Sequence, residues 1–390
     1  MNRYHKIIVF PVIIIFLSLI LSGCWSNKDI SERALIAAVG LDMGEDKQIE
    51  FTIQIINPAV VSAQQPGTPN ESPVWIHTSK GTTVFEAIRN QFKVSNKSPF
   101  YSHIQLIVIG EKMAKEGISD VLDFFERNHE TRLTANILIA KGTTAQKILS
   151  LKSSLEQIPA VHLQGIIAQH EKSGEIQNSR LIDVVKALSN EGIQPTISVI
   201  EIANAGGNSD DMHNIMIQGS GVFREDRLIG WLEPEETVGL LYIKNMVKGG
   251  IINVSNPMEK GKTISIEEIR SSVKTDVKFI DNKPYFYINI DAHGSIAGQQ
   301  GRKTTADPFM LKELEKECER KLKSIAANTM TVSQKKYKCD IVGVGEIMHI
   351  KYTEYWKQVK NDWRNIYSRI PVEINVDFTI QRTGRMNTPI

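Results

Sequence analysis

A cysteine close to the N-terminus stands in a setting that suits covalent lipid attachment. Cys24 follows Leu21, Ser22 and Gly23 at the end of a short apolar segment. The small residues let the peptide enter a signal peptidase as an extended strand, and the thiol then lies at the membrane surface, where a diacylglyceryl group can be transferred to it. The sequence therefore predicts a bacterial lipoprotein cleaved before Cys24, whose two acyl chains are enough for stable anchoring.

The segment before this cysteine has the layout of a secretory signal peptide. A basic start with Arg3 and Lys6 precedes an almost unbroken apolar run from Ile7 to Leu21. That run is shorter than the about 20 apolar residues that a membrane-spanning helix needs. We therefore predict that residues 1–23 are removed. The alternative is an uncleaved anchor helix, and in both cases the rest of the chain lies on the outer face of a membrane.

The two other cysteines are too few for a disulfide-rich scaffold. Cys318 lies on the apolar stripe of an expected helix, and Cys339 precedes an apolar strand. Both positions favour buried free thiols, because a free cysteine behaves as a small hydrophobe. A single bridge between them is the alternative in an oxidising outer compartment.

No catalytic or metal-binding constellation stands out. The chain has no HExxH, no G-x-S-x-G, no GxxxxGK[ST] and no G-x-G-x-x-G after a strand. The histidines after residue 100 lack the paired spacing of a metal site; they are His103, His129, His162, His170, His213, His293 and His349. Glu235 and Glu236 sit early in an expected helix, where carboxylates favour the helix dipole. We therefore predict no enzyme activity, no cofactor and no bound metal.

Length and charge narrow the class of protein further. The 390 residues are enough for two or three domains with substantial cores. Without residues 1–23, which hold two basic residues and no acidic one, 44 basic residues balance 44 acidic ones. This balance argues against a nucleic-acid partner and against polybasic attraction to lipid headgroups. Attachment must then come from the acyl chains or from a protein partner.

The first half alternates between strand-like and helix-like segments. Residues 49–56 alternate apolar and polar side chains, as a half-buried strand does. Thr83 and Glu86 form a capping box at the start of a helix. Other strands are expected at 34–41, 74–79, 104–109, 136–140 and 196–202, and other helices near 118–125, 144–151 and 181–188. This order predicts a mixed α/β unit with helices covering a sheet. The proline-rich segment 57–73 is expected to be a long mobile loop.

The run ANAGGNSDD at 203–211 is the best linker candidate, because glycine, asparagine and aspartate favour turns. We therefore predict an N-terminal mixed α/β region at 24–202, a linker at 203–213 and a C-terminal α+β domain at 214–390. The second domain should begin with a hairpin around 224–227 and a helix over 233–246. Strands at 265–277 and 285–291 and a helix at 308–328 follow, with Leu311, Leu314, Cys318, Leu322 and Ile325 on its apolar face.

Near the C-terminus, one helix face collects Tyr352, Trp356, Val359, Trp363 and Ile366. The following strand has Val372, Ile374, Val376, Phe378 and Ile380 on one face. One interpretation is an amphipathic helix packed on a sheet. The other is that Trp356 and Trp363 extend to a partner surface, as exposed aromatic residues often do.

Several short motifs occur in an order and spacing that resemble one family. They are Gly23, Cys24, Trp25, Ile30 and 38–42 (AVGLD), then 219–223 (GSGVF), 226–232 (DRLIGWL), Glu236, Thr237, Gly239, Cys339, Asp340, Gly343, Gly345, Glu346, Tyr355, Trp356, Trp363 and 382–384 (RTG). Together they span the mature chain, which resembles the Ger(x)C family, the lipoprotein C subunits of spore germinant receptors. The motif glycines 219, 221, 230, 343 and 345 suit bulges and close backbone approach, so we expect them to serve the fold.

The resemblance implies a multi-domain mixed α/β protein on the outer face of the spore inner membrane. It implies a non-enzymatic subunit that acts with integral membrane A- and B-type subunits to turn nutrient binding into commitment to germinate. In this family nutrient specificity is ascribed to the membrane subunits, so no direct nutrient binding is expected. The alternative is a solute-binding lipoprotein that captures a small nutrient between its domains, since domain interfaces are common ligand sites.

Overall fold

The computed structural model describes residues 33–62, 72–91, 93, 97–152, 156–169, 174–202, 215–301 and 308–382. The predicted signal peptide, the lipobox with Cys24 and the predicted linker lie outside these ranges. Within them, no helix combines the length and the apolar character needed to cross a membrane.

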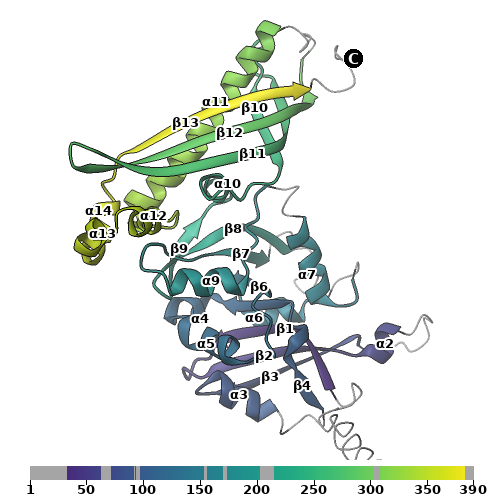
Figure 1. Ribbon diagram of the computed structural model, residues 1–390. Coiled ribbons are helices and arrows are strands. Elements are labelled where there is room, and N and C mark those ends of the chain that lie inside the picture. Colours follow the sequence, from purple (N-terminus) through teal and green to yellow (C-terminus); the bar gives the residue numbers. More distant parts are fainter. Residues whose placement is uncertain are drawn as a thin grey trace, which may run out of the picture.

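The strands form two separate sheets at opposite ends of the molecule, with helix α10 between them (Figure 1). The first sheet contains β1 (Arg33–Met43), β2 (Ile49–Ile56), β3 (Val74–Gly81), β4 (Ser98–Phe100), β5 (Leu106–Gly110), β6 (Asn136–Ala140), β7 (Thr196–Ile202), β8 (Ile215–Arg224) and β9 (Arg227–Leu232). The second contains β10 (Gly250–Ser255), β11 (Thr263–Ile280), β12 (Lys283–Gln299) and β13 (Val372–Arg382).

Helices cover these sheets and fill the space between them. In the first half they are α2 (Pro58–Ser62), α3 (Val84–Gln91), α4 (Glu111–Glu116), α5 (Ser119–Arg127), α6 (Ala145–Ser150), α7 (Pro159–Ala168) and α9 (Leu181–Leu188), with a 3-10 turn, η2, at Tyr101–His103. In the second half they are α10 (Pro234–Ile243), α11 (Pro308–Thr331), the π-helical turn η4 (Val332–Tyr337), α12 (Val344–Lys351), α13 (Thr353–Val359), the 3-10 turn η5 (Lys360–Asp362) and α14 (Trp363–Tyr367).

The first sheet is the middle of three layers. Its order is β3-β2-β1-β5-β6-β7-β8-β9, with β1, β5, β6 and β7 parallel to one another and β4 paired to β1. Buried residues of α3, α4, α5 and α9 pack on one face, and those of α6 and α7 pack on the other. Because both faces are covered, the central strands are continuous apolar runs such as Leu106–Gly110, every residue of which is buried.

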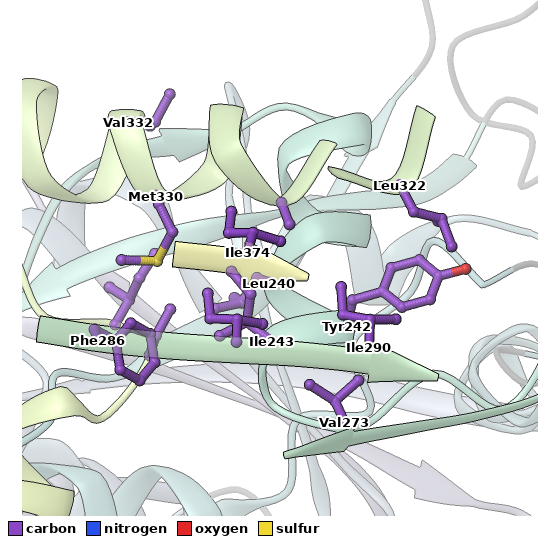
Figure 2. Close-up of a cluster of buried hydrophobic side chains, with 14 of the residues drawn as sticks. Leu240, Tyr242, Ile243, Val273, Phe286, Ile290, Leu322, Met330, Val332 and Ile374 are labelled. Atoms are coloured by element: carbon purple, nitrogen blue, oxygen red, sulfur yellow. The ribbon is translucent and has the colours of Figure 1, made fainter. Parts of the chain in front are cut away.

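The second sheet has order β10-β11-β12-β13, and α10 and α11 pack on one of its faces. The long β11–β12 hairpin alternates buried and exposed residues, as expected for a sheet with one face in water. Figure 2 shows the resulting core, in which Leu240 and Ile243 of α10 and Met330 of α11 meet Phe286, Ile290 and Ile374 of the sheet. The predicted inward face of the last strand is confirmed, since Ile374 and Phe378 are buried.

The mixed α/β fold class is confirmed, but the first sheet crosses the predicted domain boundary. The sequence analysis assigned the hairpin of β8 and β9 to the second domain, whereas β8 pairs antiparallel with β7. Strands consecutive in sequence tend to be neighbours, so a strand after a linker returns readily to the one before it. The hairpin also bridges the cores: Phe223 and Leu228 pack with the first sheet, while Val222 and Leu232 join the core of the second.

Three local expectations changed in detail. The predicted continuous helix through Tyr352 and Ile366 is broken into α13, η5 and α14, because helix propensity yields to tertiary packing. The expected loop at 57–73 begins with the short helix α2, and residues 63–71 lie outside the described part of the chain. The helix predicted at 308–328 continues to Thr331.

Candidate functional site at the junction of the two sheets

The loop between η4 and α12 carries a buried aspartate that organises the junction of the two sheets. Asp340 is only 4% exposed. Its carboxylate accepts hydrogen bonds from the backbone N–H groups of Gly343, Val344 and Gly345 at 2.8, 3.1 and 2.7 Å. It also accepts one from the indole Nε1 of Trp363 at 3.0 Å. This single side chain therefore holds the start of α12 against α14.

These donors offset only part of the cost of burying the charge of Asp340. Burial raises the pKa of Asp340 to about 6, although the hydrogen bonds from Gly345, Trp363, Gly343 and Val344 act in the opposite direction. At neutral pH the group is therefore the carboxylate, which is the form that can accept all four hydrogen bonds. The arrangement leaves no free lone pair aimed at a substrate, so we interpret it as structural.

Two glycine backbones meet where α12 touches the segment between α9 and β7. A Cβ atom on Gly345 would lie 2.6 Å from the carbonyl oxygen of Gly192 and 2.8 Å from Trp363 Nε1. A Cβ atom on Gly192 would lie 2.4 Å from the backbone nitrogen of Glu346. That nitrogen donates to the Gly192 carbonyl at 3.0 Å. Any side chain at either glycine would separate the two backbones.

Further hydrogen bonds join the segment after α9 to the loop around Asp340. Gln194 donates its backbone N–H to the carbonyl oxygen of Asp340 at 2.7 Å. Asn190 donates its side-chain amide to Glu346 Oε1 at 3.0 Å. An exposed ion pair between Lys360 and Glu191, at 3.0 Å, lies at the edge. Sequence analysis missed the 190–194 segment, because nothing in its local pattern indicates which distant loop it contacts.

Tyr337 and Cys339 attach the same loop to the β8–β9 hairpin. The hydroxyl of Tyr337 donates to the carbonyl of Trp231 at 2.7 Å and accepts from its backbone N–H at 3.0 Å. The tyrosine ring occupies the space in which a Cβ atom on Gly230 would lie, 2.4 Å from Cε1. Cys339 Sγ donates to the Phe223 carbonyl at 3.1 Å. The motif residues of the hairpin and of the loop are thus direct neighbours.

Trp356 and Trp363 lie in the core, with 1% and 7% of their surface exposed. Their rings contact each other edge to face, with centroids 5.1 Å apart. Neither ring is presented to a partner in this structure, so the geometry agrees with the packing interpretation and not with an exposed contact surface. The seven-residue spacing of the two tryptophans fits both interpretations, so only their burial distinguishes packing from partner contact.

Profiles of two known domains match this chain on either side of the segment that follows β7. Residues 26–202 match the spore germination protein N-terminal domain. Residues 218–384 match the spore germination B3/GerAC-like C-terminal domain. The chain belongs to the GerAC family of spore germination proteins. The resemblance deduced from the motifs is thereby confirmed, and the family comprises germinant receptor subunits.

Full-length relatives support this GerAC assignment. Spore germination protein KC of Bacillus subtilis (strain 168) is 28% identical, over 98% of this chain and 97% of the relative. Spore germination protein B3 of the same organism is 26% identical, over 95% and 97%. The crystal structure of the GerBC protein has the same fold, with a TM-score of 0.58 at 23% identity, covering 88% of this chain and 96% of that one.

The N-terminal GerAC motif that ends in Asp42 also has a structural explanation. Asp42 follows Leu41 in β1, and its carboxylate accepts the backbone N–H groups of Ala145 and Gln146, both at 2.9 Å. Burial raises the pKa of Asp42, while these two hydrogen bonds oppose the shift. The motif therefore fixes α6 to the end of β1.

Both cysteines of the described chain are buried free thiols, as the sequence analysis favoured. Burial raises the pKa of Cys318 and of Cys339 to about 12, so neither is a thiolate at neutral pH. Within the described ranges, no three side chains of His, Cys, Asp or Glu gather as a metal ion would require. The junction holds its two sides together through backbone hydrogen bonds and close glycine contacts.

Proposed function

We propose that this GerAC protein is the lipid-anchored C-type subunit of a spore germinant receptor and that it couples or scaffolds the integral membrane A- and B-type subunits. It would lie on the outer face of the spore inner membrane, held by a diacylglyceryl group on Cys24, and would act without catalysis. The observation that carries this proposal is the junction around Asp340, where residues of the family motifs bond to the segment between α9 and β7.

Anchoring explains how such a subunit could work with weak contacts. A lipid tether restricts the protein to the membrane surface and raises its effective concentration beside a membrane partner without any new contact. A rigid junction would then let a displacement of the first sheet with its helices move the second sheet with its helices. One side of the junction belongs to the first sheet and its helices, and the other side belongs to the second sheet and its helices. The junction therefore suits a coupling role.

The anchor is tested by fractionating cells that carry the wild-type chain or the Cys24→Ala variant. We expect the wild type in the membrane fraction and the variant in the soluble or secreted fraction. Ser22→Ala keeps a small residue before the cleavage site and is the matched control, which should stay with the membrane. Equal membrane attachment of wild type and Cys24→Ala would contradict lipid anchoring.

The coupling role is tested by isolating the anchored protein from spore membranes under mild detergent. We expect the A- and B-type subunits to be recovered with it, and to be recovered in smaller amount with Cys24→Ala. Spores with the variant should also germinate more slowly on nutrient addition. Recovery of the wild-type protein without either membrane subunit would contradict the proposal.

A further inference from the structure

An open groove of about 570 Å³ lies on the surface between α3 and α5. Val84 and Phe85 of α3 and Phe124 of α5 give it an apolar lining. The Phe85 side chain is 57% exposed, and the guanidinium group of Arg89 lies over its ring, 5.2 Å from the centroid. Contiguous apolar surface that is open to solvent is typical of contact with a partner or a membrane. The groove is therefore a candidate docking surface.

The groove lies close to the point at which the described chain begins. β1 starts at Arg33, whose guanidinium group lies over the Phe100 ring, 4.5 Å from the centroid. Tyr101 follows Phe100, and its ring contacts Phe124 of the groove edge to face, with centroids 6.0 Å apart. A short series of ring contacts thus connects Arg33 with the groove. Both α3 and β4 lie at the end of the molecule that is remote from the second sheet (Figure 1).

The predicted lipid anchor holds this end of the molecule near the bilayer. Eight residues, 25–32, separate Cys24 from Arg33. Even when fully extended, a segment of this length spans only about 30 Å. The end that carries α3 and β4 is therefore the one that the tether keeps at the membrane surface. A tethered surface meets the bilayer at high effective concentration, so a weak contact is enough to dock it.

The charges around the groove suit a bilayer surface without net charge. Arg89 and Arg127 are balanced by Asp120 and Asp123, and Arg127 pairs with Asp123 at 2.7 Å. This balance argues against binding that depends on a net charge of the membrane. The guanidinium group of Arg89 can donate to a lipid phosphate, while the Phe85 ring beneath it suits the apolar layer below the headgroups.

We propose that the groove between α3 and α5 is a bilayer-contact surface, which docks on phospholipid with Phe85 inserted below the headgroups and Arg89 on a lipid phosphate. This inference rests on the proposed anchor at Cys24, which supplies the proximity, and adds a second point of attachment. A tether alone leaves the protein free to rotate above the membrane. Two points of attachment fix the orientation of the first sheet relative to the bilayer.

The test tethers the mature chain, residues 24–390, to phosphatidylcholine vesicles that contain a lipid with a photoactivatable diazirine in its acyl chain. A maleimide lipid coupled to the Cys24 thiol supplies the tether, because Cys318 and Cys339 are buried. A failure of lipidation in the cell therefore cannot mimic a failure of the groove. We expect peptide mass mapping to find cross-links on α3 and α5 and none on Phe309 of α11, which is 64% exposed. Absence of cross-links from α3 and α5 would overturn the proposal.

Two matched variants locate the contact. Phe85→Asp places a charge where the ring should enter the bilayer, and should lower cross-linking at Phe124 about tenfold. Phe309→Asp makes the same change at a similarly exposed phenylalanine of α11 and should leave this cross-linking unchanged. Because both side chains are exposed, both variants should keep the wild-type midpoint of urea unfolding. Equal cross-linking at Phe124 in the two variants would overturn the proposal.

A membrane protein is the other occupant that could cover the groove, and the same variants distinguish it. Loss of the A- and B-type subunits from the material recovered with Phe85→Asp, with lipid cross-links at Phe124 unchanged, would assign the groove to a protein and overturn the lipid contact. Unchanged recovery of these subunits together with lost cross-links would support the lipid contact. Neither result depends on the fractionation of Cys24→Ala, which tests the anchor by itself.

Discussion

Two buried aspartates, Asp42 in β1 and Asp340 at the junction, both accept backbone N–H groups, but they hold together parts of different size. Each lies in a family motif, and each accepts backbone N–H groups at the start of a helix. Asp42 has two such donors, both within its own unit. Asp340 has three, together with the indole N–H of Trp363, and the backbone around it also bonds to Gly192 and Gln194 in the segment between α9 and β7. The motif that ends in Asp42 therefore secures helix α6 to its own sheet, whereas the motif around Asp340 secures the second sheet and its helices to the first.

The two sheets also differ in how many of their faces are covered by helices. The first is covered on both faces, while the second is covered on one face by α10 and α11. In the second sheet, two backbone N–H groups of the edge strand β13 are bonded to side chains. Glu319 and Glu315 of α11 accept the N–H groups of Phe378 and Ile380. Such capping of an edge hinders unwanted strand pairing.

The largest expected effect comes from Asp340→Asn. The asparagine has one acceptor oxygen where the carboxylate has two, and its amide turns a donor toward other donors. We expect a loss of about 3 kcal/mol in the free energy of unfolding, measured with urea. Asp377→Asn on the exposed face of β13 is the matched control, expected within about 0.5 kcal/mol. A loss below about 1 kcal/mol for Asp340→Asn would break the contrast with Asp42.

Gly345→Ala tests the contact between backbones at the junction. Its methyl group would overlap the Gly192 carbonyl and Trp363 Nε1, so we expect a loss of about 2 kcal/mol in a urea titration. Gly165→Ala is the control, because in α7 its methyl group meets no atom within 4 Å and should stabilise the helix by up to about 1 kcal/mol. Similar behaviour of the two variants would show that the junction is not tightly packed.

Asp42→Asn should have a smaller effect than Asp340→Asn. The asparagine oxygen can still accept one of the N–H groups of Ala145 and Gln146, so one donor loses its partner. We expect a loss of about 1.5 kcal/mol. Hydrogen exchange should show faster opening of α6, with α12 unchanged. Loosening of α12 in this variant would mean that the two aspartates are coupled.

The pH dependence gives the smallest expected effect. The pKa of Asp340 is about 6 in the folded state and near 3.8 when exposed, so the folded state binds more protons between these values. Stability contributed by this group therefore rises as the pH falls through 6 and is lost as the pH rises. The stability difference between wild type and Asp340→Asn should grow by about 1 kcal/mol from pH 7 to pH 5. A constant difference, measured by urea unfolding at both pH values, would contradict the raised pKa.

Local patterns were enough to predict much of this protein. Alternation in β13 and the apolar stripe of α11 predicted which faces are buried, because side-chain periodicity follows directly from backbone geometry. The order of strands and helices predicted a mixed α/β fold, and the spaced motifs predicted the family. The two described cysteines were correctly interpreted as buried thiols, although Cys339 lies in the loop before α12 and not before a strand as expected.

What only the tertiary structure decided are the contacts between distant segments. The pairing of β8 with β7, the meeting of Gly192 with Gly345, and the burial of Trp356 and Trp363 depend on partners far away in the chain. The same holds for Glu268, which is buried where α10, α11 and β10 meet and accepts a hydrogen bond from the Tyr242 hydroxyl. A sequence pattern reports which side of an element is apolar, but the energy of a buried polar group depends on which atoms surround it, and those are set by the fold.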